Sequence, residues 1–309
     1  MPTSAHSDPN LLGGLPTEQR NLETVNIDRV DTLTMVQLLN AQDATVAGSV
    51  ERALPDIARA IDAITERMKR SGRLIYVGAG TSGRLGVLDA SECPPTFNTD
   101  PGLVIGLIAG GDHALRHPVE NIEDQPEEGK SSLKAIHLSA RDAVVGIAAS
   151  GRTPFVIGAL QYARHVAAVT ISLSNVQDSR IAEHADIAIA IVTGPEALTG
   201  STRMKAGTAQ KMVLNMLSTG TMIRLGKTYS NLMVDVQPSN EKLRDRAIRI
   251  VAEAVEIDHD AASNLLDAAA SKVKTAVLMG LLDLDVRDAE TRLASADGVI
   301  RAALNPDQP

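Results

Sequence analysis

A loop rich in glycine and hydroxyl residues directly after an apolar segment could hold a phosphate group. Leu74–Val77 is short, apolar and rich in residues that favour β-structure, and it predicts a buried strand. Glycines that allow a tight turn and hydroxyl donors follow it, namely Gly78, Gly80, Thr81, Ser82 and Gly83. A helix beginning near Gly83 or Arg84 would direct its free N–H groups at the same place, which favours an anion. The segment predicts a phosphate-binding loop, with an ordinary strand–helix turn as the alternative.

A carboxylate stands at the far end of the same expected helix. Glu92 lies in the segment Asp89–Pro95, so one short stretch of chain can hold a phosphate and bring an acid or base near the rest of the ligand. A lone glutamate on a helix usually lies on a solvent-exposed face. The acid–base interpretation of Glu92 therefore depends on the wider motif and not on the residue alone.

The spacing of Gly78, Gly80 and Gly83 also fits the G-x-G-x-x-G pattern of dinucleotide-binding folds. In those folds an acidic residue ends a second strand about twenty residues further on. Here that position is occupied by Asn98–Gly102, which is typical of a turn. The loop also lacks the Gly-Lys-Ser/Thr ending of a nucleotide-binding P-loop, so a small phosphate ester fits it better.

A second loop of the same kind follows another apolar segment. It contains Ser150, Gly151 and Thr153, and Pro154 is well placed for the first position of a helix. The simpler role of the two hydroxyl residues is N-capping, which is compatible with phosphate binding because both present donors at one helix start. Two such loops are a more specific signal than either one.

The composition limits the class of protein. The chain has 309 residues, 44% hydrophobic and only 2% aromatic, which predicts a globular protein with an aliphatic core in one large domain or two modest ones. Its net charge of −8, without a basic stripe, argues against nucleic-acid binding. No apolar run reaches eighteen residues and the first residues do not resemble a signal peptide, so we expect no membrane partner.

The sequence offers no pattern for a metal site. Cys93 is the only cysteine, which excludes a cysteine-rich zinc site and fits a reducing compartment such as the cytoplasm. His113 and His117 are four residues apart but lack the glutamate of a His-Glu-x-x-His pattern. We therefore expect these two histidines to be surface or packing residues.

Strands and helices alternate from Arg73 onward. Five apolar segments predict strands: Leu74–Val77, Leu103–Ala109, Ala143–Ala148, Ala168–Leu173 and Ile187–Val192. Helical spacing between them, notably in Asp112–Ile122 and Pro154–His165, predicts an α/β fold whose parallel sheet is sandwiched by helices. Ligands bind such sheets at the carboxyl ends of the strands, where both hydroxyl-rich loops would lie.

Long motifs in this order resemble the N-acetylmuramic acid 6-phosphate etherase family, which has the sugar isomerase (SIS) fold. The motifs are Gly78–Gly86, Asp89–Thr96, Gly146–Pro154, Gly200–Lys211, Asn231–Val236 and Asn240–Leu243. The resemblance extends from about residue 25 to the C-terminal helices. It implies a carbon–oxygen lyase of cell-wall sugar recycling that uses no cofactor and acts as a homodimer with loops shared across the interface.

The resemblance also implies roles for residues. The two acid–base carboxylates of the family fall on Glu92 and Glu123, with Glu120 as the alternative to the second because one helical turn would separate the pair. Substrate or phosphate contacts fall on the two loops, at Gly80, Thr81, Ser82, Gly83, Ser150, Gly151 and Thr153. Further candidates are Ser201, Thr202 and Lys205, for which a capped helix start is the competing interpretation.

The implied reaction explains why two carboxyl groups are needed. Family members split the D-lactyl ether at C3 of the open-chain sugar phosphate by elimination and then add water. One group removes the C2 proton, an acid protonates the departing lactyl oxygen, and carboxyl groups in different protonation states can do both. A non-catalytic phosphosugar sensor, as in the glucokinase regulatory protein, and a SIS-type sugar phosphate isomerase are the alternatives. The two glutamates argue against the sensor, and Asp89–Pro95 argues against the isomerase.

The expected domains follow from these patterns. Residues 1–24 are predicted to be a mobile N-terminus, and residues 25–65 to form N-terminal helices in which Pro55 marks a start or a kink. Residues 66–229 form the SIS phosphosugar-binding domain. Residues 230–309 form a helical region, in which Asp258 and Asp285 are predicted to stand at the starts of two helices.

Overall fold

The computed structural model describes residues 16–238 and 240–305. The described residues divide into two compact units, an α/β unit of residues 16–91 and 102–218, and a helical unit of residues 92–101, 219–238 and 240–305. Two long helices, α4 (Gly80–Phe97) and α8 (Lys205–Arg224), pass from the first unit into the second. Among the described residues, no helix is long and apolar enough to cross a membrane.

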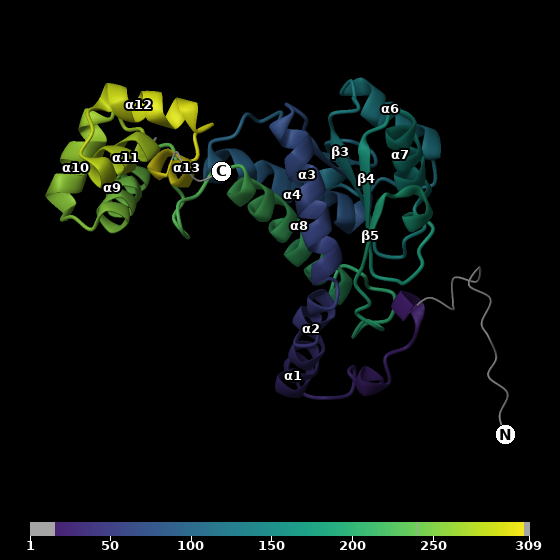
Figure 1. Ribbon diagram of the computed structural model, residues 1–309. Helices are drawn as coiled ribbons and strands as arrows, with labels where there is room; N and C mark the ends of the chain where they lie inside the picture. The colour runs from purple at the N-terminus through teal and green to yellow at the C-terminus, as the bar shows by residue number, and fades with distance from the viewer. Residues whose placement is uncertain (1–15, 239, 306–309) are drawn as a thin grey trace. The chain divides into compact units, whose positions relative to one another are not determined.

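The α/β unit is built on a five-stranded, wholly parallel sheet (Figure 1). Its order is β2 (Val104–Ile108), β1 (Leu74–Gly78), β3 (Ala143–Ala148), β4 (Val169–Ser174) and β5 (Ile187–Ala190). Every residue of β1 and β3 is buried, as expected for central strands covered on both faces. All five strands predicted from apolar segments are confirmed.

Helices cover both faces of this sheet. On one face, α6 (Pro126–Ala135) and α7 (Pro154–His165) pack against Ile75, Val77 and Val144 in one continuous core. On the other, α3 (Leu54–Lys69) lies on β3, β4 and β5, and α4 packs so closely that a Cβ on Gly86 would lie 2.9 Å from Cβ of Tyr76 (Figure 1). The predicted α/β sandwich is therefore confirmed.

The N-terminal helices are α1 (Thr32–Asp43) and α2 (Val46–Glu51), and α3 begins anew at Leu54. Pro55 is in the first turn of α3, where its missing N–H costs nothing, so it marks a helix start as predicted. The segment Asp112–Ile122, expected to be helical, forms only the short α5 (His113–Arg116). Pro118 explains the difference, because it disfavours a helical backbone at His117, which is extended (ψ 137°).

Residues 16–24 are the part of the expected mobile N-terminus that the structure describes. They form two short 3-10 helices, Pro16–Glu18 and Leu22–Thr24, in which Thr17 and Thr24 are buried. The Thr24 hydroxyl donates to the backbone oxygen of Ala197, 2.8 Å away. The rest of the expected mobile segment, residues 1–15, lies outside the described residues.

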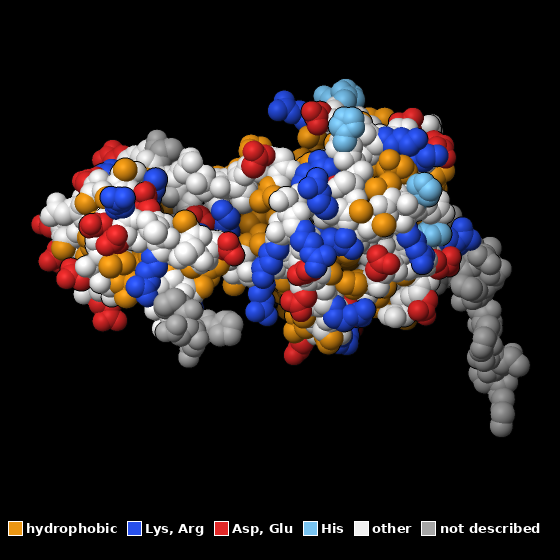
Figure 2. Space-filling view, turned by 45° about the horizontal axis from the view of Figure 1, so that its top comes forward, with side chains coloured by type: hydrophobic (Ala, Val, Ile, Leu, Met, Phe, Trp, Pro, Cys, Tyr) orange, Lys and Arg blue, Asp and Glu red, His pale blue; other side chains and the backbone are white. Residues whose placement is uncertain are grey.

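The helical unit contains α9 (Glu241–Val255), α10 (His259–Ala268), α11 (Val273–Leu282), α12 (Val286–Ser295) and α13 (Ile300–Leu304). Asp258 and Asp285 each accept a hydrogen bond from the backbone N–H three residues further on, so both predicted caps are confirmed. An aliphatic core that includes Val251, Leu266 and Val277 holds these helices together. Acidic and basic side chains are interspersed over the visible surface of this unit (Figure 2).

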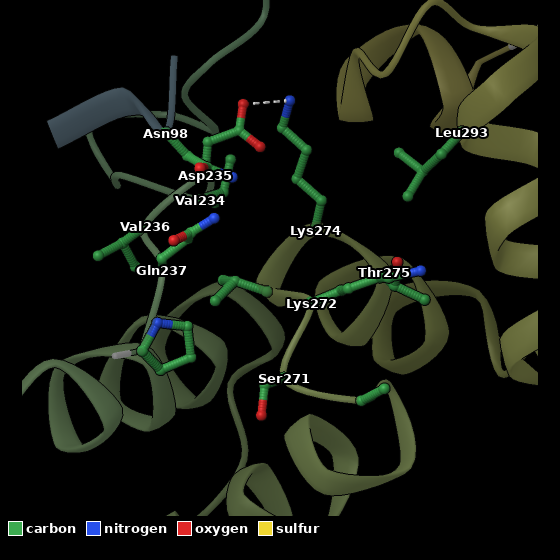
Figure 3. Close-up of a pocket in the computed structure, with 13 residues that line it drawn as sticks. Asn98, Val234, Asp235, Val236, Gln237, Ser271, Lys272, Lys274, Thr275 and Leu293 are labelled. Carbon is green, nitrogen blue, oxygen red and sulfur yellow. Dashed lines mark ion pairs between the residues drawn. The ribbon is translucent and has the colours of Figure 1, made fainter. Parts of the chain in front are cut away.

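One carboxylate of the helical unit holds two lysines. Asp235 lies 2.7 Å from the ammonium of Lys274 and 3.2 Å from that of Lys227, and all three side chains are largely buried. The pair formed with Lys274 lines a cavity of about 580 Å³ at the start of α11 (Figure 3). None of the residues predicted from the sequence to bind substrate lines this cavity, so its ion pairs join segments of the unit rather than form the predicted site.

A buried ion pair fixes the start of the central strands. Asp142 accepts from the Arg73 guanidinium at 2.8 Å, from the Arg73 backbone N–H at 2.9 Å and from the Ser139 N–H at 2.9 Å. Burial alone would raise the pKa of Asp142, but these hydrogen bonds outweigh it and hold that pKa below its ordinary value. The ionised carboxylate is thus favoured by the fold itself.

We predict that Asp142→Asn lowers the free energy of unfolding by about 2–4 kcal/mol at pH 7, because it leaves the partly buried Arg73 without its counter-charge. A depressed folded-state pKa stabilises the fold above the unfolded value of 3.8, and this contribution is lost as the pH falls through the folded pKa. The difference between variant and parent should therefore shrink in urea titrations performed below pH 3.8. An equal difference at pH 7 and at low pH would contradict this account.

Candidate functional site

The two predicted phosphate loops are neighbours because their strands are paired. β1 lies beside β3 with Gly78 opposite Ile147, so both strands end at the same edge of the sheet. From β1 the chain goes on to β2 on one side, whereas from β3 it goes on to β4 on the other side. In open α/β sheets a crevice forms at such a switch point, outside the carboxyl ends of the strands.

The first loop is more compact than the sequence indicated. α4 begins at Gly80, which has a left-handed φ of 52°, instead of at Gly83 or Arg84. A Cβ on Gly83 would lie 2.7 Å from the backbone oxygen of Gly78, so only glycine allows this approach. The orphan N–H groups of the first turn of α4 therefore lie within the predicted loop itself.

A cavity of about 340 Å³ joins this loop to the predicted second glutamate. Its lining includes Ala79, Gly80, Glu120 and Glu123. Both glutamates belong to an exposed irregular segment, not to one helical turn as we expected, yet both line the same cavity. The structure thus brings Glu123 to the start of α4 and also keeps Glu120 there.

Arginine and backbone contacts fix the walls of this cavity. The Arg84 guanidinium donates to the backbone oxygens of Ala114 and Leu115, at 2.7 and 3.1 Å, and so ties α5 to α4. On the other side, the Phe155 N–H in the first turn of α7 donates to the backbone oxygen of Glu123 at 3.0 Å. Glu123 is therefore held between the starts of α4 and α7.

The second loop leads directly into α7. Gly151 has a left-handed φ of 65°, and a Cβ there would lie 2.2 Å from Cβ of Ser179, so glycine is required. Thr153 is the N-cap residue of α7, but its side chain makes no capping hydrogen bond, and Ser150 and Thr153 are both half-buried. The simpler capping role is thus not the one that the Thr153 hydroxyl performs.

A third segment reaches the first loop through the start of α8. A Cβ on Gly207 would lie 3.4 Å from Cγ2 of Thr81, which places the segment carrying Ser201 and Thr202 beside α4. Both hydroxyl residues are half-buried. Lys205 is 3% exposed, and its ammonium donates to Oε1 of Gln42 at 2.9 Å.

Sequence reasoning missed the acid that caps α8. Glu196 is fully buried and accepts the backbone N–H groups of Lys205 and Ala206, each at 2.9 Å. A buried carboxylate at a helix N-terminus is stabilised by these hydrogen bonds and by the helix dipole. Glu196 stands nine residues before Lys205 on a separate loop, so no capping-box spacing could have revealed it.

Ser82 was predicted from the sequence, but the buried polar partners that hold its side chain were missed. The Ser82 hydroxyl donates to Oε1 of Gln210 at 2.9 Å, and Nε2 of Gln210 donates to Oδ1 of Asn175 at 3.0 Å. Because Ser82 donates its one proton to Gln210 here, its backbone N–H and its lone pairs are what it offers a ligand in this arrangement.

A second group of buried hydrogen bonds lies seven residues further along α4, at Asp89. Asp89 accepts from the Tyr76 hydroxyl at 2.8 Å, from Nδ2 of Asn215 at 2.8 Å and from the Ser218 hydroxyl at 3.1 Å. The signal for these residues was polar side chains at helical spacing on faces that otherwise have the pattern of an apolar core.

Glu92 is exposed and belongs to the part of α4 assigned to the helical unit. It follows Thr81 by three helical turns, which puts the two residues on one side of α4 about 16 Å apart along the axis. Within the described residues, no group of three histidine, cysteine or acidic side chains could hold a metal ion.

Comparison with family models finds the SIS fold twice. The model for the glucokinase regulatory protein N-terminal SIS domain matches residues 56–164, and the SIS domain model matches residues 119–220. A solved phosphoheptose isomerase from Francisella tularensis superimposes with a TM-score of 0.50 at 16% identity, over 63% of this chain and all of that one. The last similarity concerns the fold alone.

Curated relatives match almost the whole chain. The N-acetylmuramic acid 6-phosphate etherase of Actinobacillus pleuropneumoniae serotype 5b (strain L20) is 54% identical over 301 residues, 96% of this chain and 99% of that protein. The etherase of Streptomyces coelicolor is 55% identical over 305 residues, 98% of each chain. That of Caldanaerobacter subterraneus is 54% identical over 290 residues, 94% of this chain and 95% of the relative.

Proposed function

Because the chain belongs to the N-acetylmuramic acid 6-phosphate etherase family and is an enzyme acting on a phosphosugar, we propose that it cleaves the D-lactyl ether of N-acetylmuramic acid 6-phosphate. The products are N-acetylglucosamine 6-phosphate and D-lactate, which makes the enzyme a carbon–oxygen lyase. The observation that carries the proposal is identity above one half over nearly the full length of relatives with this name.

The chemistry proceeds in two halves. In the open-chain sugar the C1 aldehyde acidifies the C2 proton, a base removes it, and the electron pair delocalises as an enolate. The C3–oxygen bond then breaks, and an acid protonates the lactyl oxygen. Water then adds to C3 of the unsaturated aldehyde while a proton returns to C2, so the two halves together consume one water and release one D-lactate. Every step needs only positioned acids and bases.

We assign the acid–base work on the lactyl oxygen and on the incoming water to Glu92, and the second acid–base role, at C2 or in ring opening, to Glu123. The position of Glu123 supports its role, because it lines the cavity at the start of α4 and is tied to the start of α7. Glu120 lines the same cavity and is the alternative second carboxylate.

Phosphate binding is assigned to the two loops. The orphan N–H groups of Gly80, Thr81 and Ser82 and the hydroxyls of Ser150 and Thr153 are suitable donors for a phosphate ester. The half-buried Ser201 and Thr202 are placed to reach the same ligand from the start of α8. For Lys205 the hydrogen bond to Gln42 favours a supporting role over direct contact.

We predict that the purified protein releases D-lactate from N-acetylmuramic acid 6-phosphate in the presence of EDTA, because no step of the proposed route needs a metal. A D-lactate dehydrogenase coupled assay measures the product directly. N-acetylglucosamine 6-phosphate, which lacks the ether, is the matched control substrate. Lactate formation no higher with the muramic substrate than with this control would exclude the etherase activity.

We predict that Glu92→Gln lowers kcat by about 10²- to 10⁴-fold while product binding is kept, because the amide has the size of the acid but cannot transfer its proton. Single-turnover lactate release and calorimetric binding of N-acetylglucosamine 6-phosphate separate the two effects. Glu66→Gln, at an exposed position of α3, is the control. Turnover by the Glu92 variant close to that of the control would show that another group does this work.

The axial distance from Thr81 to Glu92 bears on oligomeric state. About 16 Å of helix separates them, so one substrate reaches both only if it lies along α4 or if a second copy supplies one of them. We propose a homodimer with shared sites. Co-expressing a Glu92→Gln chain with a Ser150→Ala/Thr153→Val chain should then give mixed dimers with lactate release well above either parent. Activity no higher than the parents, or a monomer by light scattering, would contradict sharing.

A further inference from the structure

A polar cluster, buried except for Glu23, joins the N-terminal segment to the start of α8. Gln42 is at its centre: Oε1 accepts from Nδ2 of Asn21 at 2.7 Å and from the Lys205 ammonium at 2.9 Å, and Nε2 donates to the Glu23 carboxylate. Gln42 is 6% exposed and Asn21 8% exposed. We call Asn21, Glu23, Gln42 and Lys205 the Gln42 cluster.

The lysine of this cluster depends on Gln42. Its ammonium is buried, and among the described residues it forms no ion pair and has Gln42 as its hydrogen-bond acceptor. A buried cation without an acceptor is costly, since it has lost its water and gained nothing in return. Removing the Gln42 amide would therefore force Lys205 to move, and with it the first residue of α8.

The same N-terminal segment holds the loop that caps α8. Nδ2 of Asn21 donates to the backbone oxygen of Pro195 at 3.3 Å, and the Thr24 hydroxyl donates to that of Ala197 at 2.8 Å. These two oxygens flank Glu196, whose carboxylate accepts the N–H groups at the start of α8. The segment therefore fixes both the cap and the helix start that it caps.

This helix start lies beside the candidate site, through the approach of Gly207 to Thr81 and through the adjoining Ser201 and Thr202. We propose that Gln42 is a positioning residue, which acts through Lys205 and Glu196 to hold these two hydroxyl residues where a phosphosugar is bound. The proposal rests on the proposed function for its kinetic test but not for its structural test. A segment that we expected to be mobile thus becomes part of the binding apparatus.

The first test replaces Gln42 with the apolar methionine of similar length in the full chain. We expect backbone hydrogen exchange of residues 205–206 to accelerate about tenfold or more, because the variant loses hydrogen bonds to a charged group. KM for the muramic substrate should rise about tenfold with kcat within about threefold, since binding contacts and not the reacting groups are displaced. Gln37→Met, at an exposed position of α1, is the matched control and should leave all three quantities unchanged.

The second test exchanges the amide at position 42 and the carboxylate at position 23, so that the hydrogen bonds of the cluster can form again. Gln42→Glu keeps the acceptor for Asn21 and Lys205 but sets a second carboxylate against Glu23, so alone it should disturb exchange and KM. Adding Glu23→Gln supplies an amide that donates to the carboxylate introduced at position 42 and regenerates every hydrogen bond of the cluster. We expect the double variant to recover both exchange protection and KM, a coupling that independent sites would not show.

The outcomes separate this proposal from the proposed function. The proposal for Gln42 would be overturned if hydrogen exchange and KM of Gln42→Met matched those of the control, or if only kcat fell. It would also be overturned if the double variant recovered no more exchange protection and no lower KM than Gln42→Glu alone. If Gln42→Met does not fold, as judged by circular dichroism, the comparison of Gln42→Glu with the double variant decides. If the parent releases no lactate, the proposed function fails, and exchange at residues 205–206 still decides the role of Gln42.

Discussion

The parallel pairing of β1 with β3 is the constraint on which the candidate site depends. It sets Gly78 opposite Ile147, so two glycine-bearing loops leave the sheet at one edge and two helices begin there. The N-termini of both helices lie at that edge of the sheet, and their backbone N–H groups give it positive potential. In the proposed function, helix dipoles placed by this strand register favour the binding of an anionic sugar by an acidic chain.

Buried polar contacts turn this topology into a defined geometry. α4 and α8 are joined by Ser82 with Gln210 and, seven residues along, by Asp89 with Asn215. Apolar packing tolerates small slips between two helices, whereas a buried carboxylate or amide is satisfied in only one register. Such contacts add little net stability compared with apolar packing, but they favour one placement of the helix starts, and a site at those starts needs that placement.

The local elements could be predicted because their signals are local. Apolar runs gave the five strands, Pro55 and Pro154 gave helix starts, and Asp258 and Asp285 gave caps. The helix expected over 112–122 failed because the effect of Pro118 on the preceding residue was overlooked. The sequence could not reveal that Thr24 is held by Ala197 or that Lys205 is held by Gln42. These hydrogen bonds join residues more than 160 positions apart.

The same distinction separates the two glutamates. A motif supplies the residue type, whereas a role requires a distance to the reacting atoms. For Glu123 the fold fixes the segment that carries it, through a backbone hydrogen bond from α7 and through the cavity at the start of α4. Glu92 is located only along its own helix, three turns from Thr81. The sugar fixes the distance between its phosphate and its lactyl oxygen, so the length of α4 between Thr81 and Glu92 is the physical reason for proposing a site shared by two subunits.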